Sequence, residues 1–161
     1  MCSATPTAAD SCCSWHREIE VLGHEYTHQW QYALGCNSVF DRKMPRWWLE
    51  GMAQYVSWRS VIDGGLVPET DVVTLLTNWT KYARIRAPPQ QLEADFPNDA
   101  SPNSVVYLAT AQLVKLSSAS AFTTFCARVA AGAAWQTAFE PSFGLSLSDF
   151  YQRFETYRDG L

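Results

Sequence analysis

The sequence predicts a mainly α-helical fold for this chain. Apolar residues recur at steps of three and four in several segments, whereas no segment shows the clear alternation of a strand. Glycine and proline fall between the helical segments, where they favour turns. A chain of 161 residues, 47% of them hydrophobic, is long enough to bury a core as one domain.

The first part of the chain is expected to divide into a disordered lead-in and a long helix. Residues 1–13 are small, polar and aperiodic, as in a disordered segment. The helix is predicted over residues 14–35, because Ser14 is a suitable N-cap and Gly35 is a favoured residue just beyond a helix end.

This helix carries a single apolar stripe. The stripe is formed by Trp15, Ile19, Leu22, Tyr26, Trp30 and Ala33. His24, Glu25 and His28 lie on roughly the opposite side. Because an amphipathic helix turns its apolar stripe to the core and its far side to water, any chemistry is expected at the two histidines.

Two further helices are predicted in the first half of the chain. One covers residues 45–63, since Pro45 suits a first turn and the two glycines that follow the segment end it. The next is Glu69–Tyr82. Residues 84–104 contain four prolines and are expected to form a long surface loop.

The last third of the chain, residues 104–158, is helical by the same criteria. The predicted helices are Val105–Leu116, Ala119–Ala130, Trp135–Phe139 and Ser148–Tyr157. The first of them is apolar almost throughout but is far shorter than the roughly 20 residues that a membrane helix needs. No membrane span is predicted anywhere in the chain.

Composition argues against several classes of function. The net charge of −4 and the pI near 5.3, without a Lys/Arg run, argue against a nucleic-acid partner. The N-terminus has neither the basic nor the hydrophobic region of a signal peptide, so it does not indicate a compartment. If the chain is a fragment of a longer precursor, we expect an exported protein. Five irregularly spaced cysteines predict no disulfide framework, and the absence of a C-x-x-C pair argues against a zinc ribbon.

The stretch VLGHEYTHQW, residues 21–30, carries the pattern H-E-x-x-H. Residues four apart project side by side from a helix, so His24 and His28 are expected to place ring nitrogens on one cation, at the zinc distance of about 2.0–2.1 Å. Glu25 would lie beside them as a general base for metal-activated water. The alternative is that both histidines form ordinary hydrogen bonds on a partly buried face.

A catalytic zinc of this kind needs a third protein ligand. The acidic candidates downstream are Asp41, Glu50, Asp63 and Glu69. Glu50 is favoured because Gly51 and Ala53 remove side-chain bulk beside it, so that its helix can approach the histidine helix closely. A glycine inside a helix otherwise costs about 1 kcal/mol relative to alanine. We therefore expect Glu50 to complete the site.

The two motifs GHEYTHQWQ and MPRWWLEGMAQYVS resemble those of the gluzincin zinc metallopeptidases, and most closely the peptidase MA-like group. In that clan H-E-x-x-H on one helix is completed by the glutamate of an E-G-x-A-x-Y helix. The similarity extends over roughly residues 19–157, with a softer match in the C-terminal part. It implies a zincin-like domain over residues 14–161 that binds Zn²⁺ through His24, His28 and Glu50, with Glu25 as general base.

Aromatic residues are expected to serve mainly in packing. The resemblance suggests a tyrosine or histidine from the C-terminal helices as donor to the tetrahedral oxyanion, and Tyr107 is the candidate, with an ordinary aromatic at the core edge as the alternative. Most of four tryptophans are expected to form the core between the two motif helices, and lining a substrate cleft is the alternative. They are Trp30, Trp47, Trp48 and Trp58.

One expected element is missing from the pattern. Gluzincins place a β-sheet before the H-E-x-x-H helix and align the substrate on its edge strand, whereas fewer than 25 residues precede His24 and none alternates like a strand. We therefore expect this sheet to be absent or truncated. The expected function is zinc-dependent hydrolysis of a peptide or protein substrate. The alternatives are an aminopeptidase-type gluzincin and a truncated or non-catalytic binding module stabilised by zinc.

Overall fold

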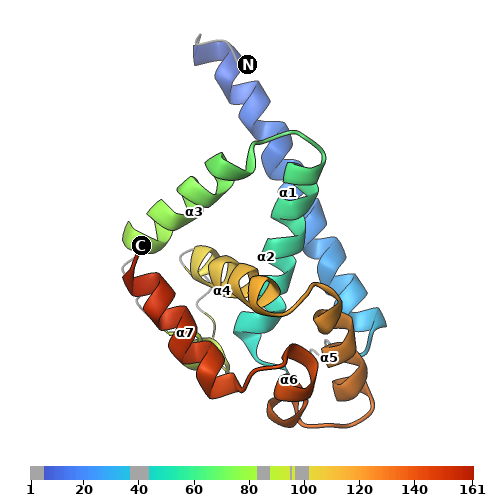
Figure 1. Cartoon of the computed structure of the whole chain (residues 1–161). Coiled ribbons are helices and arrows are strands. Elements are labelled where there is room, and N and C mark those ends of the chain that lie inside the picture. Colours follow the sequence, from blue (N-terminus) through green and yellow to red (C-terminus); the bar gives the residue numbers. More distant parts are fainter. Residues whose placement is uncertain (1–5, 37–43, 83–87, 95, 97–101) are drawn as a thin grey trace.

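The computed structural model describes residues 6–36, 44–82, 88–94, 96 and 102–161 (Figure 1). They form seven α-helices and one short 3-10 helix, and no strand occurs among them. The prediction of a mainly α-helical fold is therefore confirmed. In chain order the elements are α1 (Pro6–Ala33), α2 (Arg46–Asp63), α3 (Glu69–Tyr82), η1 (Pro89–Leu92), α4 (Asn103–Leu116), α5 (Ser120–Ala130), α6 (Trp135–Phe143) and α7 (Leu147–Asp159).

Most helix boundaries lie within two residues of the predicted ones, and two differ by more. Helix α1 begins at Pro6, so residues 6–13 are helical where a disordered lead-in was expected. Helix α6 continues to Phe143, beyond the predicted end at Phe139. Pro141 removes one amide hydrogen from α6 without ending it, and the helix stops only at Gly144, whose φ of 74° is left-handed.

The apolar stripe of α1 is not the face that packs against α2, so the expected orientation of this helix is wrong. Leu22 and Tyr26 of the stripe are 69% and 74% exposed. The face toward α2 instead carries Gly23, Thr27 and Gln31, and the last two are buried. Side-chain size explains the choice: a Cβ at Gly23 would lie 3.2 Å from Ser57 of α2, so this small residue allows the two helices to approach closely.

Helix α2 also packs closely against α4, on another of its faces (Figure 1). A Cβ at Gly51 would lie 2.4 Å from Thr110 Oγ1 and 2.7 Å from the carbonyl oxygen of Val106. Gly51 therefore permits close approach as expected, but its partner is α4 and not the histidine helix. Gly23, rather than Gly51, permits the approach of α1.

The aromatic core lies between the start of α2 and the C-terminal helices. Trp47 stacks on Phe150, and its Nε1 donates a hydrogen bond of 2.9 Å to the hydroxyl of Tyr151. Trp48 stacks on Phe122 of α5 at a ring distance of 5.8 Å. Both tryptophans are fully buried. They join α2 to the C-terminal helices, and not to the other motif helix as expected.

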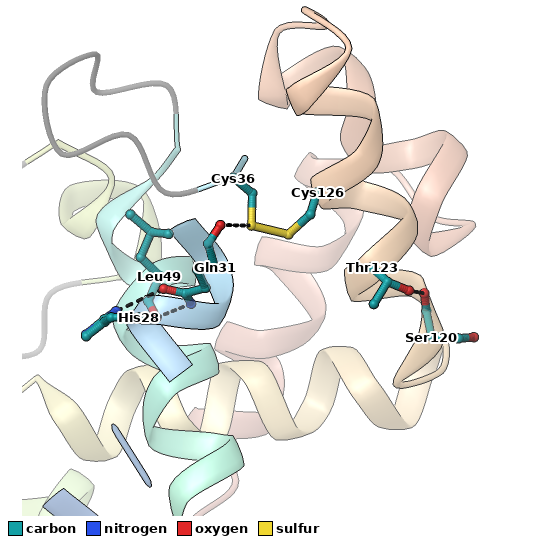
Figure 2. Close-up of a disulfide and its surroundings, with 7 residues drawn as sticks. All are labelled: His28, Gln31, Cys36, Leu49, Ser120, Thr123 and Cys126. Atoms are coloured by element: carbon teal, nitrogen blue, oxygen red, sulfur yellow. Dashed lines mark hydrogen bonds between the residues drawn. A yellow bond between two sulfur atoms is a disulfide. The ribbon is translucent and has the colours of Figure 1, made fainter. Parts of the chain in front are cut away.

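A disulfide between Cys36 and Cys126 ties the end of α1 to α5 (Figure 2). Their Cα atoms are 4.8 Å apart, although 90 positions separate them in the sequence. The irregular cysteine spacing therefore conceals one buried crosslink. In the chain-entropy model, a crosslink over a loop of this length stabilises the fold by roughly 4–5 kcal/mol.

No single described helix is long and apolar enough to cross a membrane. Helices α4 and α5 meet the length and composition criteria only as a pair bent by 101°. Much of their apolar surface is buried in the core.

Replacement of Gly51 by alanine is expected to destabilise the fold. The new methyl group would meet a backbone carbonyl of α4, which cannot rotate away, so overpacking should lower the free energy of unfolding by about 1–3 kcal/mol despite the better helix propensity of alanine. Urea denaturation measures this change. Gly160→Ala is the matched control, because a Cβ there meets nothing closer than 3.4 Å. Equal or greater stability of Gly51→Ala would contradict the proposed packing.

Candidate metal centre

Three side chains from α1 and α2 converge on one point. His24 and His28 lie on successive turns of α1, and their Nε2 atoms are 3.1 Å apart. Glu50 of α2 brings its Oε2 to 3.4 Å from each of these nitrogens. The three side chains are 14–20% exposed, so the group lies at the floor of a depression and still reaches solvent.

The spacing of the three atoms fits a tetrahedral zinc site. At ligand distances of about 2.0–2.1 Å, two ligand atoms of a tetrahedral ion are about 3.3–3.4 Å apart. The observed separations of 3.1, 3.4 and 3.4 Å agree with that value. Two imidazoles and one carboxylate are also a donor set that zinc accepts. The residues present therefore fit the ion.

Electrostatics at the site favour a cation between these side chains. Burial alone would raise the pKa of Glu50, but hydrogen bonds from His24 and His28 and the charges of His28 and Arg46 lower it to about 2. Burial alone would lower the pKa of His28, yet its hydrogen bonds with Glu50 and Gln31 and the charge of Glu50 raise it. Without a metal, a proton on His28 can supply this positive charge, and metal binding would release that proton.

Gln31 fixes the orientation of His28 (Figure 2). His28 Nδ1 lies 2.9 Å from Gln31 Oε1, which suits an Nδ1–H donor and leaves the Nε2 lone pair directed toward Glu50. The amide nitrogen of Gln31 donates to the carbonyl oxygen of Leu49 at 2.9 Å. Leu49 precedes Glu50, so one fully buried side chain links the candidate ligand His28 of α1 to the segment of α2 that carries Glu50.

Two other residues of α2 support the remaining ligands. Gln54 Nε2 lies 3.3 Å from His24 Nδ1, and a half-turn of the amide would place its oxygen there to accept from an Nδ1–H. Arg46 forms an ion pair of 3.2 Å with Oε1 of Glu50, the oxygen that does not face the histidines. Arg46 was missed in the sequence, although its position four residues before Glu50 is the spacing of a helical ion pair.

The other acidic candidates do not join the group. Asp63 and Glu69 both pair with Arg59, and Asp41 lies outside the described residues. Among the described residues, the group that could hold a metal has three members, His24, His28 and Glu50.

Tyr107 lies away from these three side chains. It is buried and its ring packs against Tyr55 at 5.9 Å. Burial, followed by the charge of Tyr55, raises the pKa of Tyr107 to about 12. It lines neither of the cavities that open at the candidate ligands. Its placement therefore matches the alternative of a packing aromatic.

Glu25 faces the open side of the centre. It is exposed and lines two cavities that both reach His24 and Glu50. One cavity, of about 520 Å³, also contains His28 and Arg46. The other, of about 710 Å³, lies between α1, α2 and α3. A carboxylate at this position can act on a water molecule at the centre without occupying a ligand position.

Comparison with known proteins adds no assignment to this geometry. No protein-family model, curated protein or solved structure matches the chain. A metal centre is therefore supported by the converging side chains themselves.

Glu50→Ala is expected to lose zinc. Removing one of three ligands should weaken zinc binding by more than the roughly 10–100-fold effect typical of residues that only support a ligand. Calorimetric titration with zinc, together with elemental analysis of the purified protein, measures this loss. Glu140→Ala, at an exposed position on α6, is the control and should bind zinc like the parent chain. Full zinc retention by Glu50→Ala would remove this residue from the ligand set.

Gln31→Leu is expected to weaken zinc binding by roughly 10–100-fold, the usual effect of losing a partner that orients a metal-bound histidine. The substitution leaves the Leu49 carbonyl and His28 Nδ1 without their partner. The same titration measures the effect, and circular dichroism checks that the fold is retained. An unchanged zinc affinity in a folded variant would show that Gln31 serves packing alone.

Proposed function

We propose that this chain is a zinc-dependent peptidase. The supporting observation is the convergence of two imidazole nitrogens and one carboxylate oxygen within 3.1–3.4 Å of one another, at the floor of open cavities. Three electron-rich atoms this close together are stabilised by a cation between them. His24, His28 and Glu50 would hold Zn²⁺, and the ion would supply Lewis acidity to water and to a peptide carbonyl.

In this proposal Glu25 carries the proton transfers. Its carboxylate would take a proton from the attacking water and deliver it to the leaving amine when the peptide bond breaks. The position of Glu25 in both cavities supports the role, because substrate and water must enter through them. Arg46 would hold one oxygen of Glu50 and leave the other for the ion.

Ligand number favours catalysis over a purely structural metal site. Structural zinc sites are closed by four protein ligands, whereas a catalytic zinc keeps a position open for water. The group formed by the described residues has three members and opens into two cavities. The similarity of its two motifs to the gluzincin pattern supports the same choice.

The disulfide supports a place of action outside the reducing cytosol. Crosslinks such as Cys36–Cys126 form and persist in oxidising compartments. We therefore propose that the peptidase works in an exported form.

Glu25→Gln is expected to abolish hydrolysis and leave zinc content unchanged, since it removes the base and no ligand. Cleavage of a protein substrate such as casein by the zinc-loaded protein, measured beside elemental analysis, tests both parts. Glu18→Gln makes the same chemical change at an exposed position of α1 that lines neither cavity, and should retain full activity.

Two outcomes would count against the proposal. Activity that survives Glu25→Gln would remove Glu25 from the mechanism. A parent protein that binds zinc, gains thermal stability from it and cleaves nothing would instead support a binding module stabilised by the metal.

A further inference from the structure

The cavity of about 710 Å³ has one apolar wall. Its size falls in the range of ligand pockets, about 300–1,000 Å³. Helix α3 supplies Val72, Leu75 and Trp79 to the wall, and α2 supplies Trp58. His24 and Glu50 lie in the same cavity. The apolar wall and the candidate metal centre therefore belong to one continuous space.

Apart from Trp58, these wall residues come from one face of α3, which lines this space. Its residues recur at steps of three and four, as neighbours on one side of a helix do. Val72 is buried, whereas Leu75 and Trp79 are 38% and 50% exposed. These two large side chains leave apolar surface beside the candidate metal centre that an apolar group entering the cavity would cover.

The charges in the cavity are acidic. Besides Glu50, it is lined by Glu20, Glu25 and Asp71. Among the described residues that line it, none is lysine or arginine. A zinc ion would compensate Glu50, but the carboxylates of Glu25 and Asp71 would still repel an incoming acidic side chain.

We propose that this cavity binds a large apolar side chain of the peptide substrate, such as phenylalanine or leucine, close to the bond that is cleaved, and that it disfavours an acidic one. The inference specifies the substrate class of the proposed peptidase and rests on that function. Leu75 and Trp79 are the residues that determine the preference, and Asp71 contributes to the rejection of acidic side chains.

Binding can be measured separately from hydrolysis. The probes are blocked hexapeptides of alanine and glycine in which one central residue is Phe, Leu, Ala or Asp. Calorimetry with the zinc-loaded Glu25→Gln variant should give at least about tenfold tighter binding of the Phe and Leu peptides than of the Ala peptide, in line with the roughly 10–200-fold discrimination of apolar pockets. Asp71→Asn should strengthen binding of the Asp peptide and leave the Phe peptide unchanged.

The wall residues are tested against a matched control on the same helix. Leu75→Ala and Trp79→Ala should each reduce the preference for Phe over Ala by about threefold or more, both in binding and in the kcat/KM of the parent enzyme. Val73→Ala should not, because Val73 is 37% exposed, as Leu75 is, but does not line the cavity. All three positions are partly exposed, so truncation should leave the melting temperature nearly unchanged.

The outcomes separate this inference from the proposed function. Equal binding of the Phe and Ala peptides, or a preference that survives both wall variants, would overturn the inference while zinc-dependent cleavage still stands. Selective binding by a zinc-loaded parent protein that cleaves no peptide would overturn the peptidase and keep the apolar site.

Discussion

The arrangement of the molecule depends on the close approach of α2 to its two neighbours. Gly23 of α1 allows a close approach to Ser57 of α2, and Gly51 of α2 allows a close approach to α4, where a Cβ would lie 2.4 Å from Thr110 Oγ1. Glu50 lies next to Gly51, and its Oε2 comes within 3.4 Å of both histidines across the contact between α1 and α2. Gln31 then fixes the position of the two helices along each other, because its amide group hydrogen-bonds both to His28 of α1 and to the carbonyl oxygen of Leu49 in α2. The packing of these helices thus brings the three candidate ligands together.

Much of the helical structure and of the candidate site could be predicted from local sequence. Helix boundaries follow from residue period, proline and glycine, and α3 has the predicted bounds. The pairing of His24 with His28 needs only the geometry of a single helix. Glu50 was predicted from the glycine beside it, which marks a close helix contact, but that contact is with α4, and the approach of α1 depends on Gly23. The partner of that contact was not predictable, because a lone glycine does not specify which helix it meets.

The features that could not be predicted from the sequence depend on contacts between segments that are distant in the chain. Cys36 and Cys126 show no spacing signal, because only the packing of α5 brings them together. The stripe that contains Leu22 and Tyr26 has the period of a buried face, but close approach at Gly23 and the hydrogen bonds of Gln31 determine which face of α1 packs. Tyr107 was selected from the gluzincin resemblance, and only the structure shows that its ring packs against Tyr55.

The disulfide also gives the chain an unusual topology. Oxidation closes residues 36–126 into a covalent ring that contains α2, α3 and α4 and therefore includes Glu50. The two histidines lie outside the ring, on a helical arm anchored to it at Cys36. A metal ion held by all three residues would thus bridge arm and ring at a second point. Such an ion would hold the arm in place as well as take part in the chemistry, since without it the arm would be joined to the ring only at Cys36, by side-chain packing and by hydrogen bonds such as that from Gln31 to Leu49.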